Sequence, residues 1–289
     1  PHAILDANGR IVGALAGRPR NSGWDDVLGN ACEVLRNIRL VGDVANCFGP
    51  NDIDHRRGRF LAVPVGVSFG GGQKVKMNEV IASALASPGL VRIAGFQSQA
   101  FYSFAPKIFR DIQSGLLKLY ENDPHLSHNF ANSIYPTVSL NCGPGTTCLE
   151  HLDYGNAPYS FCAVTALGQY DPDLGGHLIL FDLKKVFRFP PGSTILLLSA
   201  TLSHGNTPIS PNATRYSVTQ YCPGGLLRWV AYGCKPVKSL GTSKQAQATR
   251  LKVDGEPGQR WREKLALFST LASLKNDYKL CPEEGHNIP

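Results

Sequence analysis

Five short runs decide the fold of this chain: TVSLNC (137–142), SFCAVTAL (160–167), HLILFDL (177–183), STILLLS (193–199) and TRYSVTQY (214–221). They are rich in β-branched and aromatic residues, and turns rich in Gly, Pro and Asp separate them. Many short strands at this spacing are typical of an antiparallel sandwich or barrel, not of a parallel sheet with crossover helices. The sequence therefore predicts a β core over residues 136–222.

Helical periodicity flanks this core on both sides. Upstream, apolar residues recur at helical spacing from about Trp24 to Ile38 and from about Ala105 to Tyr120. A short helix is expected after Asn78, because asparagine is a good N-cap. Downstream, one predicted helix face collects Trp261, Leu265, Phe268 and Ala272.

The chain of 289 residues is long enough to bury a substantial core, and its 43% hydrophobic and 18% charged residues are ordinary for a globular protein. We expect one domain over residues 1–289, mostly β with flanking helices (α+β). It has an N-terminal mixed flank (1–135), the β core (136–222) and a C-terminal helical extension (223–289). No apolar run approaches the roughly 20 residues that cross a bilayer, so no membrane partner is expected. Because it starts at Pro1, we expect a trimmed or processed chain.

The chain is basic, with a net charge of +7 and a pI of about 9.0. Such a field attracts nucleic acids and other polyanions, although many basic proteins bind none. Basic side chains gather at Arg56-Arg57-Gly58-Arg59, with Lys74 and Lys76 further on. Contact with phosphates is one interpretation of this segment, and a solvated basic loop is the default one.

The eight cysteines form no C-x-x-C pair, which argues against a zinc ribbon or finger. Several, such as Cys162 and Cys222, lie within or beside apolar strand-like runs, where a buried reduced thiol is the usual explanation. We therefore expect an intracellular, reducing location.

Three candidate metal ligands lie close to the predicted strands. His151 and Asp153 are two positions apart, so in an extended segment both side chains point to the same face. His204 can complete the set from a later strand end. Two imidazoles and one carboxylate suit Fe(II) and leave adjacent coordination positions open. The same donors also bind zinc, so a zinc hydrolase is a competing interpretation.

A candidate anion site follows in the run from Thr214 to Tyr221. Arg215 lies 11 residues after His204, and the period of two puts Arg215 and Ser217 on one face of the strand. A guanidinium with a hydroxyl matches the distal carboxylate of 2-oxoglutarate, with a bidentate geometry that lysine lacks. The alternative is an exposed strand arginine paired with a surface acid. A zinc hydrolase would leave this pair of residues without a role.

With these residues in this order, the chain resembles the 2-oxoglutarate/Fe(II) dioxygenases of the cupin-like, jelly-roll class. The resemblance covers about a third of the chain, from Val138 to Tyr221. It is carried by His151-x-Asp153, Gly175-Gly176, Pro190-Pro191-Gly192, His204 and Arg215-x-Ser217. Within the class the chain is most similar to the TET/JBP branch, including fungal members, which oxidises methyl groups of nucleic-acid bases.

This resemblance implies a catalytic domain with a double-stranded β-helix core. His151, Asp153 and His204 would be catalytic and bind Fe(II), and Arg215 and Ser217 would hold 2-oxoglutarate. Dioxygen is the second co-substrate, and ascorbate is a candidate reductant. His177, at the start of a predicted strand, occupies the place of a histidine that touches 2-oxoglutarate in TET-type enzymes; a solvent-facing histidine is the equal alternative.

The resemblance also implies substrate-binding residues. TET-type enzymes carry H-x-D-x-x-N, whose Asn contacts the target base, and Asn156 matches it, although Asn is also a common turn residue. Tyr154 could form an aromatic platform for a base that has left its stack. Tyr159 and Phe161 could add to that platform, with packing in the next strand as an equal alternative.

The chain departs from the TET pattern in three places. Pro223 stands where those enzymes place a base-contacting histidine. Arg92 is a conceivable counterpart of their additional arginine, but no local motif assigns it. Their cysteine-rich zinc-binding region has no equivalent. These departures leave the chemistry in place and weaken the inference about the substrate.

The expected function is oxidation of methyl groups of modified nucleobases, 5-methylcytosine or N6-methyladenine, in DNA or RNA, in the nucleus. The alternative is a 2-oxoglutarate-dependent hydroxylase of a small molecule or a protein side chain, which Pro223 favours. A third hypothesis is a binding module without activity, against which the intact set of ligands argues.

Overall fold

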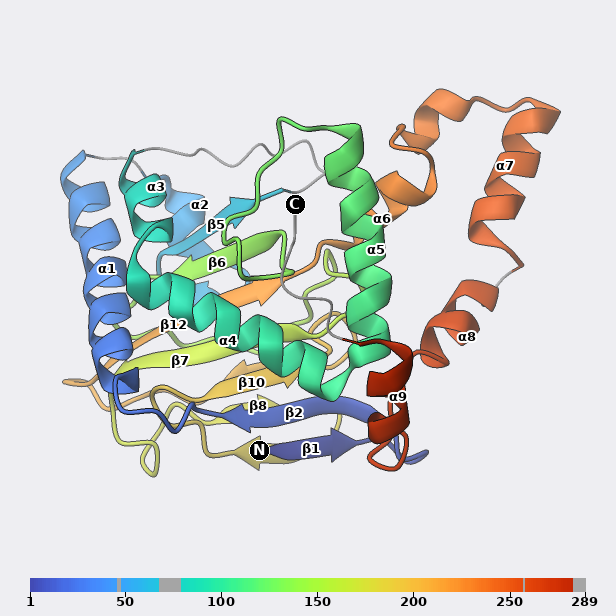
Figure 1. Cartoon of the computed structure of the whole chain (residues 1–289). Coiled ribbons are helices and arrows are strands. Elements are labelled where there is room, and N and C mark those ends of the chain that lie inside the picture. The colour runs from blue at the N-terminus through green and yellow to red at the C-terminus, as the bar shows by residue number, and fades with distance from the viewer. Residues whose placement is uncertain (46–47, 68–78, 257, 283–289) are drawn as a thin grey trace.

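Two antiparallel sheets form the centre of this computed structural model, which describes residues 1–45, 48–67, 79–256 and 258–282. The larger sheet contains, in spatial order, β1 (His2–Leu5), β2 (Ile11–Gly17), β10 (Thr194–Leu197), β7 (Cys162–Gln169), β12 (Thr214–Tyr221), β6 (Thr137–Asn141) and β5 (Ala62–Gly66) (Figure 1). The smaller sheet contains β11 (His204–Asn206), β8 (Leu178–Leu180) and β9 (Lys185–Phe187). A separate hairpin joins β3 (Asp54–His55) to β4 (Gly58–Arg59).

Helices cover the larger sheet and extend beyond it. They are α1 (Trp24–Ala45), α2 (Pro50–Ile53), α3 (Glu79–Leu85), α4 (Pro88–Phe104), α5 (Pro106–Asn122), α6 (Gly224–Ala231), the 3-10 helix η1 (Val237–Leu240), α7 (Lys244–Asp254), α8 (Gln259–Leu265) and α9 (Leu274–Leu280). Helix α4 crosses the sheet and contacts β2, β7, β10 and β12, while α1 packs on α4 and β7. Helix α6 packs against α5, whereas α7 and α8 project away from the sheets (Figure 1).

The α+β fold with a β core and flanking helices is confirmed, although helices cover more of the described residues than strands do, and each of the five quoted runs contains a strand. The two sheets face each other across an apolar layer that includes Ala166 and Ile195 from the larger sheet and Leu178 and Leu180 from the smaller one. The larger sheet also takes β1, β2 and β5 from before residue 136, so it extends beyond the predicted core of residues 136–222. The domain boundaries themselves stay a prediction.

Strand β12 shows how the sheet separates a packing face from a functional face. Val218 packs under α1 and α4, and the Gln220 side chain reaches the same helix layer, where Nε2 donates to the carbonyl of Ala94 (3.1 Å). The alternate residues Arg215 and Ser217 face the opposite way, into a cavity between the sheets. The period of two therefore places the candidate anion site inside the molecule.

The predicted helices at Trp24–Ile38 and Ala105–Tyr120 are confirmed as α1 and α5. Helix α4 was not predicted. Its signals are an N-cap at Ser87, whose Oγ accepts from the Leu90 N–H, and proline at the first helical position. Glycine obscured the pattern: a Cβ at Gly89 would lie 2.8 Å from the Val27 carbonyl of α1, so close packing of two helices requires glycine there. The expected N-cap Asn78 lies outside the described residues.

The predicted C-terminal helix face is wrong in part. Helix α8 ends at Leu265, so Phe268 and Ala272 do not continue it. The chain instead becomes extended, because Ser269 accepts a hydrogen bond from the Ile11 N–H (2.8 Å) and Thr270 pairs with Arg10. Phe268 is buried there, with its ring 6.4 Å from that of Phe161. Tertiary pairing thus overrides the helical period.

Among the described residues, no single helix is long and apolar enough to cross a membrane. Helices α3 and α4 pass that test only as a pair bent by 58°, by length and composition. Both helices have buried faces in the core beneath them.

Candidate metal and dicarboxylate site

The three predicted metal ligands converge at one end of the space between the sheets. His151 and His204 pair through two backbone hydrogen bonds of 3.0 Å each. Nε2 of His151 lies 3.8 Å from Asp153 Oδ1, and Nε2 of His204 lies 3.9 Å from Asp153 Oδ2. Candidate ligand atoms of all three residues lie within 4.8 Å of one another. A single ion can therefore be shared by two stretches that are far apart in the sequence.

Backbone contacts orient both imidazoles for metal binding. Nδ1 of His151 lies 2.7 Å from the Leu149 carbonyl, and Nδ1 of His204 lies 2.9 Å from the Leu202 carbonyl. A carbonyl only accepts, so Nδ1 carries the proton in each ring and Nε2 keeps its lone pair for a metal. Burial lowers the pKa of both histidines, and the neighbouring His204 lowers that of His151 further. Both rings are thereby held in the neutral form that a metal needs.

The donor set fits Fe(II). Two neutral imidazoles and one carboxylate form the facial triad of non-haem iron oxygenases, with positions left open for other ligands. Asp153 is held in place by its backbone, whose N–H donates to the Ser199 carbonyl (2.8 Å). His151, Asp153 and His204 are thus the residues that would hold iron in this protein.

Arg215 is a buried guanidinium without a carboxylate partner among the described residues. Its exposed fraction is 3%, its Nη1 donates to the Thr146 carbonyl (2.9 Å), and its Nε has no hydrogen-bond partner. The Phe189 ring lies 5.8 Å from the guanidinium carbon. A buried unpaired charge is costly, so this position is suited to receive an anion. The alternative of an exposed arginine paired with a surface acid is wrong.

One cavity connects this guanidinium to the three ligands. His151, Asp153, His204, Arg215 and Ser217 all line it. Asn141 and Thr219 line it too, and the Asn141 amide donates to Ser217 Oγ (2.8 Å). Val164, Ile195 and Leu197 contribute an apolar wall. We call this space the metal cavity. It holds a metal-binding end and a cationic end, as a chelating dicarboxylate requires.

In the basic segment at residues 56–59, some arginines contact the site and others face the solvent. Arg57 lines the metal cavity, and its carbonyl accepts from the Leu149 N–H (2.8 Å). Arg56 Nη1 donates to the Leu152 carbonyl (2.7 Å), and its Nη2 lies 3.9 Å from Asp153 Oδ1. Arg56 is nevertheless 56% exposed, and Arg59, with 84% of its side chain exposed, fits the default of a solvated loop. Lys74 and Lys76 lie outside the described residues.

Sequence reasoning therefore missed the roles of Arg56 and Arg57. The only signal in the sequence was the basic cluster itself. Nothing local connects the β3–β4 hairpin to Leu152, which lies 96 positions later. Asn141 was missed in the same way, since it lies in a predicted strand without a motif.

The contact of His177 with 2-oxoglutarate stays a prediction. His177 is not among the residues that line the metal cavity; its Nδ1 lies 3.1 Å from Thr207 Oγ1. Arg92, the conceivable second arginine, is exposed on α4, on the helical side of the larger sheet. The structure brings Arg57, not Arg92, to the cavity.

The predicted substrate residues have different surroundings. The Asn156 amide donates to Ser199 Oγ (2.9 Å), and the Ser199 carbonyl accepts from the Asp153 N–H. Asn156 therefore helps to hold the segment that carries Asp153 in position. Tyr154 is 75% exposed, and the Arg56 guanidinium lies 5.5 Å from its ring centre. Tyr159 and Phe161 are buried packing residues, so a substrate platform from them is wrong. A substrate contact by Tyr154 or Asn156 stays a prediction.

No family model and no curated protein matches the sequence. Several solved structures resemble it in fold. They include NgTET1 in complex with 5mC DNA (13% identity, 77% of this chain and 76% of that chain, TM-score 0.41). Others are a prolyl-4-hydroxylase from Pseudomonas putida (13%, 70% and 97%, TM-score 0.31) and an oxidoreductase of the 2OG-Fe(II) oxygenase family from Burkholderia pseudomallei (17%, 71% and 92%, TM-score 0.35). At these identities and scores, the functional assignment rests on the chain's own residues.

Proposed function

We propose that this protein is an iron(II)- and 2-oxoglutarate-dependent oxygenase. One observation carries the proposal: three oriented metal ligands and a buried, unpaired guanidinium line the same cavity. His151, Asp153 and His204 would hold the iron, and Arg215 with Ser217 would hold the far carboxylate of 2-oxoglutarate. A zinc hydrolase would need no buried guanidinium next to its metal.

When bound, iron and 2-oxoglutarate would supply the oxidising power drawn from dioxygen, with ascorbate as a candidate reductant. The protein itself binds and orients. Carbonyls of Leu149 and Leu202 keep the two Nδ1 protons in place, and Arg56 and Ser199 hold the segment that carries Asp153. The apolar wall of Val164, Ile195 and Leu197 limits water in the cavity.

For the substrate we propose methyl groups of modified nucleobases, 5-methylcytosine or N6-methyladenine, in DNA or RNA. The TET/JBP resemblance, His151-x-Asp153-x-x-Asn156 and the basic charge support it. Two observations favour the alternative, hydroxylation of a small molecule or a protein side chain. Pro223 replaces the base-contacting histidine, and the Asn156 amide is engaged by Ser199.

The test is succinate release by the purified protein with Fe(II), 2-oxoglutarate, ascorbate and oxygen. Methylated oligonucleotides are compared with their unmethylated counterparts, and base products are identified by mass spectrometry. We expect His204→Ala to abolish metal binding and turnover, a loss larger than the roughly 10–100-fold typical of a supporting residue. His125→Ala, at an exposed histidine, is the matched control.

Absence of both 2-oxoglutarate binding and succinate release in the iron-loaded protein would contradict the oxygenase proposal. Succinate release stimulated by metabolites or peptides, with every oligonucleotide inert, would replace the nucleobase substrate by the alternative one.

A further inference from the structure

The positive charge of the chain is concentrated in its C-terminal helices. Residues 224–282 contain 11 Lys and Arg against four Asp and Glu, so this segment alone carries a charge of +7, equal to that of the whole chain. The remaining residues are balanced. The metal cavity therefore lies in a nearly neutral body, and the attraction for polyanions originates in the extension.

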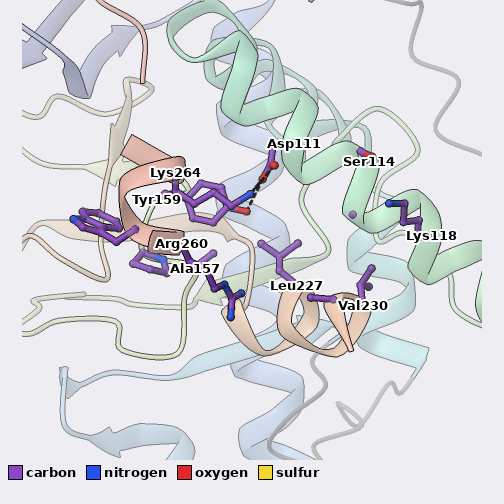
Figure 2. A pocket seen from close by; sticks show the side chains of 14 residues that line it. Asp111, Ser114, Lys118, Ala157, Tyr159, Leu227, Val230, Arg260 and Lys264 are labelled. Carbon is purple, nitrogen blue, oxygen red and sulfur yellow. Dashed lines mark hydrogen bonds and ion pairs between the residues drawn. The ribbon is translucent and has the colours of Figure 1, made fainter. Parts of the chain in front are cut away.

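Two hollows are lined by helix α6, and both include Arg260 in their lining. The first, of about 540 Å³, lies between α5, α6 and α8, and Figure 2 shows its side chains. The second, of about 680 Å³, lies between α6, η1 and α7. We call them together the α6 trough. Its cations outside ion pairs are Lys118, Arg228, Lys235 and Lys238, and its large aromatic residues are Tyr159, Trp229, Tyr232 and Trp261.

The acidic side chains of the trough are already neutralised. Lys264 Nζ donates to both carboxylate oxygens of Asp111 (2.6 and 2.7 Å), as Figure 2 shows, and Arg260 pairs with Asp254 (2.7 Å). In contrast, the four cations Lys118, Arg228, Lys235 and Lys238 are exposed, and no acidic group in the described part of the chain pairs with them. The trough thus presents unpaired positive charge beside one exposed aromatic ring, that of Trp261, which is 41% exposed, whereas Tyr159 and Tyr232 are buried.

The trough begins where the metal-binding segment ends. Ala157, Pro158 and Tyr159 line its first hollow, directly after Asn156. Helix α6 is fastened to the same segment, because the Gly224 N–H donates to the Gly155 carbonyl (2.9 Å) and Asn156 pairs with Pro223. A polymer lying in the trough would therefore pass next to the residues that carry Asp153.

We propose that the α6 trough binds single-stranded nucleic acid, an inference that rests on the proposed nucleobase substrate. Separate cations along a groove contact phosphates, and exposed aromatic rings stack on bases without regard to sequence. A single strand offers both groups at once, whereas the bases of a duplex are stacked inside. An acidic peptide would use the cations but would not use the exposed ring of Trp261 for stacking.

The test is fluorescence anisotropy of labelled single-stranded oligonucleotides, without iron or 2-oxoglutarate, over a range of salt concentrations. The trough variant replaces Arg228, Lys235 and Lys238 by Glu. The control variant replaces Arg20, Lys185 and Lys275, which are exposed outside the trough, by Glu and makes the same change in net charge. We expect the slope of log affinity against log salt to fall by about 2 in the trough variant, roughly 0.7 per lost phosphate contact, and to stay nearly unchanged in the control.

A second variant, Trp261→Ala, should weaken binding about fivefold or more and leave the salt slope unchanged, because stacking involves no counterion. Thermal unfolding of each variant checks that it folds. Equal loss of binding in the trough and control variants would overturn the proposal, as would displacement of the oligonucleotide by polyglutamate at equal charge.

The two proposals fail in different ways. If the wild-type protein binds the strand through the trough but oxidises no base, the nucleobase function fails and the trough stands. If the trough variant binds and oxidises methylated strands like the wild type, the trough fails and the function stands.

Discussion

The metal cavity holds its charged side chains buried and fixed, whereas the α6 trough holds them exposed. In the cavity, His204 and Arg215 are buried, and hydrogen bonds of the two sheets fix where they point. In the trough, Arg228 is exposed on helix α6, and Lys235 is exposed in the loop between α6 and η1. Helix α6 packs on α5 and buries Leu226 in the core, and the ion pair of Lys264 with Asp111 joins α8 to α5.

This difference separates two requirements. Binding a metal and a dicarboxylate demands fixed geometry, which a sheet provides by register, and burial then strengthens each electrostatic contact. Attracting a polyanion demands accessible charge, which acts at a distance and tolerates variation in position. The comparison predicts that substitutions in the cavity have large effects that depend on geometry. Substitutions of residues that hold the helices of the trough against the rest of the protein should have small and local effects.

The largest effect is expected from Arg215→Lys, which keeps the charge and removes the bidentate fork. Because hydrogen bonds to charged groups contribute about 1.5–3 kcal/mol, the dissociation constant of 2-oxoglutarate should rise roughly 10–100-fold, measured by titration calorimetry of the metal-loaded protein. Arg188→Lys, at an exposed arginine paired with Asp173, is the control. Equal affinities for both variants would mean that charge alone, without geometry, is enough in the cavity.

A smaller effect is expected from Arg56→Gln. Its contacts to the Leu152 carbonyl and to Asp153 would be lost, so the segment carrying the carboxylate ligand would be less well positioned. We expect metal affinity to fall about tenfold, as for other residues that support a ligand, measured by competition with a chelating dye. Arg59→Gln, on the same hairpin but exposed, should change nothing. Equal metal affinities of the two variants would show that Arg56, like Arg59, does not support the metal ligand.

Near pH 6, where histidines titrate, acid should act on the body and not on the extension, because residues 224–282 contain no histidine. Burial lowers the pKa of His128, whose ring lies 3.9 Å from that of Tyr120. Its stabilising contribution is therefore complete above the unfolded-state pKa of about 6.5 and is lost as pH falls below it.

The variant His128→Phe keeps the stacking and removes the titration. We expect the free energy of unfolding, measured with urea, to fall less steeply below about pH 6.5 than in the wild type. The difference in slope should be at most about 1.4 kcal/mol per pH unit. Identical slopes in both proteins would show that His128 does not contribute to acid sensitivity.

The smallest effect is expected from Lys264→Met, which removes the ion pair with Asp111 and leaves the Tyr159 hydroxyl as the partner of that carboxylate. Partly exposed ion pairs contribute about 0.2–1 kcal/mol, so the global unfolding temperature should hardly change. Limited proteolysis should instead cut faster within α7 and α8. A clear drop in global stability would show that the extension and the sheets form one cooperative unit.

The sequence alone was sufficient for the five core strands, for the candidate metal ligands and for the face that holds Arg215. These features follow from local rules, because alternate residues of a strand point to opposite sides and residues i and i+2 point to the same one. The two helices with clear apolar periods, α1 and α5, were predictable for the same kind of reason.

Only the tertiary structure decided which distant residues join them. It brought Arg56 and Arg57 to Asp153, engaged Asn156 with Ser199, placed His177 outside the cavity and ended α8 before Phe268. It also gathered cations from α5, α6, α8 and the η1 region into one trough. Contacts of this kind depend on the packing of the whole chain, and no local period encodes them.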